Sequence, residues 1–195
     1  MGFSFYSLAV KGGTRDSVLS ALGLRGSGTF EEVPESDITG TALPSGWYLI
    51  VVNRSVPPFA DEKVLAHLST STDVVTGFVE EHVMCSSVEQ WSGGHKIWSV
   101  LHAADTGGIE HLKTTGDLPS IFTSIENGLR SKQQAAGGNK VGVDYIFDIP
   151  VELIEKLTGY RHDRVMPELG VKPFEVLFTT QATPKRSWLR RLFGV

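Results

Sequence analysis

Apolar positions in this chain form short runs and alternations that predict more strands than helices. Residues 46–54, GWYLIVVNR, are the most apolar segment, and we expect a strand covered on both faces because polar residues do not alternate there. Pro34 cannot donate to a ladder, so the strand at 28–34 is expected at a sheet edge. The expected strands cover residues 3–11, 28–34, 46–54, 74–84 (or on to 91), 95–104, 109–114, 143–147 and 174–180.

Four segments show helical spacing of apolar residues together with a suitable start or end. Thr14 can cap the first helix, Asp61 lies near the start of the second, and Pro119 begins the third. The fourth has Pro150 in its first turn and ends at Gly159. The residues expected on the buried faces of the first three helices are Val18, Leu19, Leu22, Val64, Leu65, Leu68, Phe122, Ile125 and Leu129.

Glycine-rich turns connect several of the strands directly. Gly93-Gly94 and residues 106–108 suit tight turns, which indicates a meander rather than a βαβ pattern. The sequence therefore predicts one α+β domain over residues 1–180, with a mainly antiparallel or mixed sheet of about 6–8 strands and about four helices on one face. Residues 181–195 are expected to form a basic, amphipathic C-terminal tail.

Composition narrows the class of protein. The single cysteine cannot form an internal disulfide, which favours a reducing, cytoplasmic location. The first residues lack the basic region of a signal peptide, and no apolar run approaches the roughly 20 residues of a membrane span. Residues 1–180 carry 14 basic and 22 acidic groups, an excess that disfavours nucleic-acid binding and favours basic partners.

Residues 80–105 hold three of the six histidines and Cys85, the only cysteine. If the hairpin turns at Gly93-Gly94 without a bulge, Cys85 lies opposite His102, and the two side chains could form a nucleophilic dyad. The alternative is that both residues are part of the packed sheet, because free cysteine usually behaves as a small hydrophobic residue. The chain has no metal-ligand spacing and no phosphate-binding glycine motif, so we expect neither a metal nor a cofactor.

A second polar cluster follows the fourth helix. Tyr160, Arg161, His162, Asp163 and Arg164 crowd one loop, and such a mixture suits recognition of a ligand or partner, although a solvated loop with local ion pairs would look the same.

Trp91, just before the hairpin turn, is either an exposed partner contact or a cross-strand packing residue.

The tail, QATPKRSWLRRLFGV, has four basic residues and no acid. In a helix after Pro184, Trp188 would lie on the apolar side, Arg190 on the basic side and Arg191 at the border. Three interpretations remain open: the tail folds back onto the acidic body, docks on a partner, or lies on a membrane surface.

The leading hypothesis is a non-enzymatic binding protein whose partner is another protein. The general type, a small acidic protein rich in hairpins, resembles many bacterial proteins of unknown function, including immunity proteins that block a toxin. The alternatives are a small Cys/His-dependent hydrolase or transferase and a peripheral membrane protein held by its tail.

Overall fold

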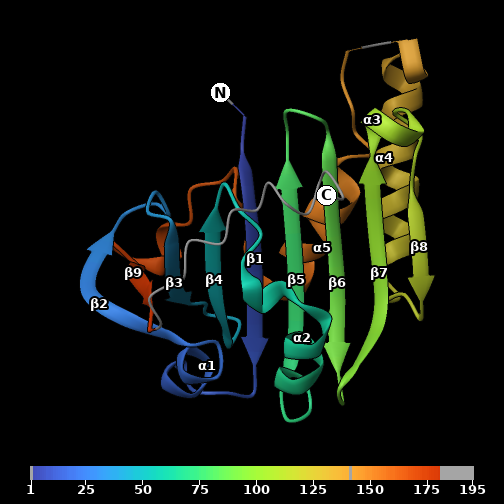
Figure 1. Ribbon diagram of the computed structural model, residues 1–195. Helices are drawn as coiled ribbons and strands as arrows, with labels where there is room; N and C mark the ends of the chain where they lie inside the picture. Colours follow the sequence, from blue (N-terminus) through green and yellow to red (C-terminus); the bar gives the residue numbers. More distant parts are fainter. Residues whose placement is uncertain (1, 141, 181–195) are drawn as a thin grey trace, which may run out of the picture.

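The computed structural model describes residues 2–140 and 142–180, and these form one open antiparallel sheet with helices packed on it (Figure 1). The strand order is β2-β9-β3-β4-β1-β5-β6-β7-β8. The strands are β1 (Ser4–Lys11), β2 (Leu24–Glu31), β3 (Ile38–Ala42), β4 (Trp47–Asn53), β5 (Asp73–Glu80), β6 (Cys85–Ser92), β7 (His95–Ala103), β8 (Lys113–Gly116) and β9 (Phe174–Thr179). The helices are α1 (Arg15–Ala21), α2 (Glu62–Leu68), α3 (Ala104–Gly107), α4 (Phe122–Ala136) and α5 (Asp148–Thr158), with 3-10 turns at Pro58–Ala60, Gly138–Lys140 and Pro167–Leu169.

The most apolar strands lie at the centre of the sheet, and β4 is covered on both faces as the sequence predicts. β1 pairs with β4 on one side and β5 on the other, and β4 is buried on both faces. β2 lies at the edge, and its register with β9 shifts between Gly26 and Phe30. The predicted fold class is thus confirmed, with nine strands in the described residues against the expected 6–8.

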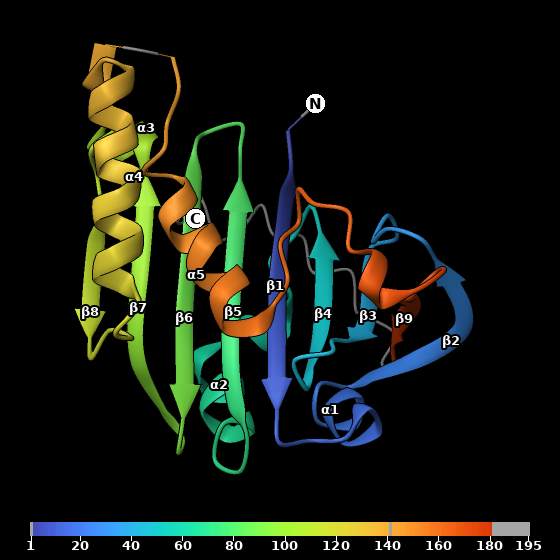
Figure 2. The ribbon, with the colours of Figure 1, turned by 180° about the vertical axis from the view of Figure 1, so that it is seen from behind.

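The helices cover both faces of the sheet, so the expectation of helices on one face is wrong. α1 and α2 pack on one face with Leu8 and Ile50, whereas α4 and α5 pack on the other with Val79 and Val100 (Figures 1 and 2). Successive strand residues point to opposite faces, and the central strands are apolar on both, so each face needs its own cover.

The helix starts and buried faces follow local sequence signals. The Thr14 side chain accepts a hydrogen bond from the Ser17 amide, and Asp61 accepts one from Lys63. The predicted helix residues that are buried are Val18, Leu19, Leu65, Leu68, Phe122, Ile125 and Leu129.

The structure contains two strands that the sequence pattern does not predict separately, β3 and β6, because their strand and turn signals are weak. β3 is short and rich in threonine and glycine, and it is ordered by pairing with β4 and β9. The segment expected as one strand from Val74 to Met84, or on to Trp91, is a hairpin, β5–β6. Its turn contains neither glycine nor proline, and Met84 itself adopts a positive φ of 49°.

Two other predicted strands are misplaced. The strand expected at 109–114 begins further along the chain, as β8, because residues 104–107 form a helical turn directly after β7. Residues 143–147 form no strand: the Asp144 carboxylate accepts the Ile146 and Phe147 amides, and Gln133 accepts the Tyr145 amide. These backbone N–H groups donate to side chains, so they are not available to pair with a neighbouring strand.

Candidate functional site

The segment from Tyr160 to Phe174 lies over one end of the central strands. It leaves α5 at Gly159, which has a left-handed φ of 82°, rises along β1, and crosses to β9 (Figure 2). This path places the predicted polar loop beside Phe3 and Phe5 at the start of β1. Chain segments far apart in sequence therefore meet at this corner of the sheet.

A cavity of about 650 Å³ lies beneath this segment, and we call it the 160–174 cavity. This volume is within the range of about 300–1,000 Å³ that is typical of ligand sites. Its apolar lining residues are Phe3, Phe5, Val33, Pro34, Val51, Tyr160, Val165, Met166, Pro167, Leu169, Val171, Pro173 and Phe174. Its polar lining side chains are Glu32, Glu35, Asn53, Arg161, His162 and Arg164.

Several apolar residues that line the cavity are left exposed by the other described residues, 2–140 and 142–180. Val165 and Val171 are 91% and 92% exposed, and Val33 and Phe3 are 50% and 46% exposed. Single exposed hydrophobic residues are common, but four that line the same cavity are more than scattered surface residues and suit a binding site.

Arg161 holds the segment in place through three carboxylates. Its guanidinium lies 2.7 Å from Asp163, 3.2 Å from Asp148 and 3.5 Å from Glu155, and only 10% of its side chain is exposed. Burial alone would lower the pKa of Arg161, but these carboxylates outweigh it and raise the pKa. Arg164 also pairs with Glu155. The loop's cations are thus largely neutralised by the loop and α5.

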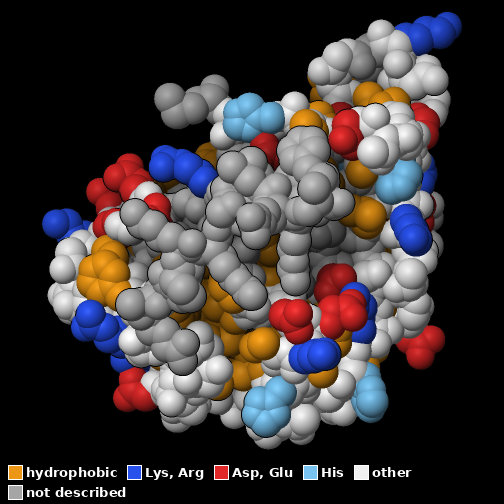
Figure 3. All heavy atoms as spheres, in the orientation of Figure 1, with side chains coloured by type: hydrophobic (Ala, Val, Ile, Leu, Met, Phe, Trp, Pro, Cys, Tyr) orange, Lys and Arg blue, Asp and Glu red, His pale blue; other side chains and the backbone are white. Residues whose placement is uncertain are grey.

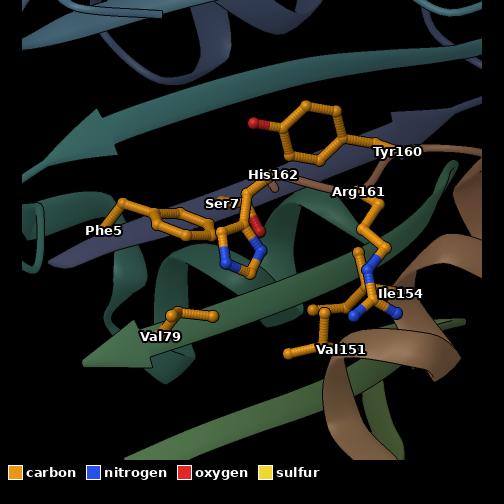
Figure 4. Close-up of a pocket in the computed structure, with 8 residues that line it drawn as sticks. All are labelled: Phe5, Ser7, Val79, Val151, Ile154, Tyr160, Arg161 and His162. Carbon is orange, nitrogen blue, oxygen red and sulfur yellow. The ribbon is translucent and has the colours of Figure 1, made fainter. Parts of the chain in front are cut away.

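His162 forms part of the wall between β1 and the loop. Its ring packs edge-on against Phe3 and tilted against Phe5, each with 4.9 Å between ring centroids. Figure 4 shows an adjoining small pocket in which the imidazole lies on the Phe5 side and the Arg161 guanidinium on the α5 side. Burial lowers the pKa of His162, and this effect exceeds the opposing influence of Asp163 and of Glu81, whose carboxylate is 3.7 Å away.

The β2–β3 connection supplies an acidic rim to the cavity. Figure 3 shows acidic side chains gathered here, where Glu31 ends β2 and the connection itself contains Glu32, Glu35 and Asp37. The Glu31 carboxylate already accepts hydrogen bonds from the Glu35 and Ser36 backbone amides. Within residues 2–140 and 142–180, neither Glu32 nor Glu35 forms an ion pair.

Cys85 and His102 do not meet, so the register expected for them is wrong. A bulge between Gln90 and Trp91 shifts the β6–β7 pairing by one residue, which places Cys85 opposite Ala103 and Ser86 opposite His102. Cys85 and His102 therefore point to opposite faces of the sheet. Burial raises the pKa of Cys85, and Asp105 and Glu80 raise it further, so the thiol is not activated.

His102 instead belongs to a buried polar network that the sequence did not reveal. Its Nδ1 lies 2.7 Å from the His111 carbonyl, and its Nε2 lies 2.9 Å from Asp144. The nearby Ser86 hydroxyl donates to the Phe147 carbonyl, so it is not paired with the imidazole. Both ring nitrogens are occupied and the His102 side chain is completely buried, which gives this network a structural role.

The remaining predicted site residues fall into three groups: those at the 160–174 cavity, one in the core, and those outside the described residues. Tyr160, Arg161, His162 and Arg164 line the 160–174 cavity, while Asp163 pairs with Arg161. Trp91 is buried in the core beside α2, and its indole N–H donates to Glu89, which agrees with the packing interpretation. The predicted tail residues Trp188, Arg190 and Arg191 lie outside the described residues.

The cavity itself could not be read from the sequence, because Phe3, Val33 and Val171 come from three segments without a common motif. No cluster of three or more metal-ligating side chains occurs in the described part of the chain. The helices described are also too short or too polar to cross a membrane. Comparisons with protein-family models, with curated proteins and with solved structures found no match.

Proposed function

We propose that this chain is a non-enzymatic binding protein that takes apolar side chains of a partner protein into the 160–174 cavity. The observation that carries the proposal is the apolar mouth formed by Phe3, Val33, Val165 and Val171, which the other described residues leave exposed. Burying such side chains against a partner stabilises a complex by roughly 25 cal/mol per Å² of apolar surface removed from water.

The wall of the cavity supports this role. The Arg161 ion pairs tie the loop to α5, and His162 is packed between Phe3 and Phe5, so the surface is largely formed before binding. A preformed surface loses less conformational entropy when a partner docks. We prefer this proposal to a Cys85-dependent hydrolase because Cys85 and His102 lie on opposite sheet faces.

Co-purification from the native cell tests the proposal when it is made specific to the cavity. We expect a protein that is retained by the wild-type chain to be lost with the double variant Val165→Asp/Val171→Asp. Val56→Asp is the matched control, because Val56 is also exposed but does not line the cavity.

The proposal fails if no protein shows this pattern of loss while all variants remain folded by circular dichroism. The immunity-like form of the hypothesis adds that the retained protein is a toxin, and a toxin gene next to the gene for this chain would support it.

A further inference from the structure

We infer that the 160–174 cavity is occupied by the chain's own C-terminal tail when no partner is bound. The apolar residues Trp188, Leu189, Leu192 and Phe193 would fill the cavity, and the basic residues would meet its acidic rim. This inference rests on the proposed function, because it makes the tail an internal competitor for the partner's site.

The chemistry of the tail complements that of the cavity. Aromatic and aliphatic side chains match walls formed by phenylalanine, valine, proline and leucine. Lys185, Arg186, Arg190 and Arg191 match the rim carboxylates of Glu32 and Glu35, which form no ion pair in residues 2–140 and 142–180. The basic side chains of the loop cannot repel the tail strongly, because Arg161 and Arg164 are already paired with carboxylates.

The tail begins within reach of the cavity. β9 starts at Phe174, which lines the cavity, and the Thr180 amide donates to the Gly23 carbonyl just beyond the other end of the strand. The six steps from Phe174 to Thr180 cover about 20 Å at a rise of about 3.3 Å per residue. The eight residues from Thr180 to Trp188 can span up to about 26 Å when extended, so Trp188 can reach the cavity.

An apolar track also leads from the tail to the cavity. Phe174, Val176 and Phe178 alternate along β9 and therefore point to the same sheet face. Phe178 is 48% exposed, with the Arg25 guanidinium 5.6 Å from its ring centroid, so the end of this track nearest the tail is about half open. A tail that turned back along β9 would cover Phe178 before it reached the cavity.

Paramagnetic relaxation in the full chain tests the inference. The background is Cys85→Ser, and Ser187→Cys then carries a nitroxide label. We expect loss of methyl signal intensity at Val33, Val165 and Val171, with no loss at Ile97, which is exposed on β7 at a distance from the cavity. Unchanged intensities at the three valines overturn the inference.

Two further samples identify the occupant. In a mixture of isotopically labelled chain without nitroxide and unlabelled chain with nitroxide, intensity loss at the valines would place a second copy's tail in the cavity and overturn the inference. In the single chain, Glu32→Lys/Glu35→Lys should weaken tail occupancy by about fivefold, as expected for two exposed ion pairs. Asp117→Lys should leave occupancy unchanged, because Asp117 is exposed and directly follows β8, at the edge of the sheet farthest from β2 and β9.

The same variants separate this inference from the proposed function. Trp188→Ser/Phe193→Ser should increase partner capture if the tail competes for the cavity. Capture that depends on Val165 and Val171 but is insensitive to these tail substitutions overturns the inference alone. If partner capture is unchanged by Val165→Asp/Val171→Asp, the proposed function is overturned, whatever the result of the nitroxide experiment.

Discussion

His102 on β7 and Asp144 in the segment before α5 face each other in the protein interior, with 2.9 Å between Nε2 and Oδ2. The second ring nitrogen faces the His111 carbonyl, and the second carboxylate oxygen accepts the Ile146 and Phe147 amides. Since a carbonyl can only accept, the Nδ1 hydrogen points at the His111 carbonyl, and Nε2 is the ring nitrogen that faces Asp144. The pair joins β7 to the start of α5.

Removing either partner should destabilise the fold strongly. Replacement of His102 by Gln or of Asp144 by Ala leaves buried polar groups without a partner, and we expect each to lower the free energy of unfolding by about 3–5 kcal/mol. Denaturant unfolding measures this loss. The double variant should lose clearly less than the sum of the two single losses, and additive losses would contradict a direct interaction.

The sequence pattern singles out His102 but predicts Cys85 as its partner, whereas in the fold its partner is Asp144. The register depends on a one-residue bulge at Gln90/Trp91, and nothing in the local sequence marks that bulge. Asp144 lies in a segment whose apolar residues resemble a strand, and only side chains from α4 and β7 show how that segment is held. Tertiary contacts therefore determined this network, whereas caps such as Thr14 and Asp61 were evident locally.

Gly77 on β5 allows α5 to approach the sheet closely. A Cβ added at Gly77 would lie 2.4 Å from Cδ1 of Ile154 and 2.6 Å from the Ser7 hydroxyl. We expect Gly77→Ala to lower the free energy of unfolding by about 1–3 kcal/mol through overpacking. In an Ile154→Ala background the additional cost of Gly77→Ala should be smaller, and an equal cost in both backgrounds would contradict this explanation.

The predicted recognition loop lies at the 160–174 cavity, and its role in recognition stays a prediction. Four of its five predicted residues line the cavity, because a dense polar and aromatic group after a helix end often lies at a surface where segments meet. The apolar mouth was missed since Val33, Val165 and Val171 are ordinary hydrophobic residues until the fold leaves them exposed together. Exposure is a property of the assembled sheet and is not encoded in any one segment.

Cys85 should react slowly with disulfide reagents in the native protein. Burial and the carboxylates of Asp105 and Glu80 raise the pKa of its thiol, which reduces the thiolate population near neutral pH. We expect modification at pH 7.5 to be slower than that of a cysteine in a short unstructured peptide, and to accelerate in denaturant. Rapid modification of the folded chain would contradict this assignment and would reopen the question of Cys-dependent chemistry.

The pH dependence of stability should contain a contribution from His162. Burial holds its folded-state pKa below the value of about 6.5 that it has in an unfolded chain. Below about pH 6.5 the unfolded chain binds a proton that the folded chain takes up less readily, so this histidine's contribution to stability is present above that pH and is lost as the pH falls through the folded pKa. The same relationship holds although Glu81 and Asp163 pull the pKa upward, because the net direction is downward.

His162→Gln removes this ionisable group and isolates its effect. We expect the unfolding free energy of the wild type to fall more steeply between pH 7 and pH 5 than that of His162→Gln, measured by denaturant unfolding across the range, because glutamine cannot take up the proton. The comparison is referenced to pH 7.5, where the histidine is neutral in both states and any remaining difference reflects its packing against Phe3 and Phe5. Parallel curves for the two proteins would show that His162 titrates alike in the folded and unfolded chains, and would remove the pH-sensitive element from the wall of the 160–174 cavity.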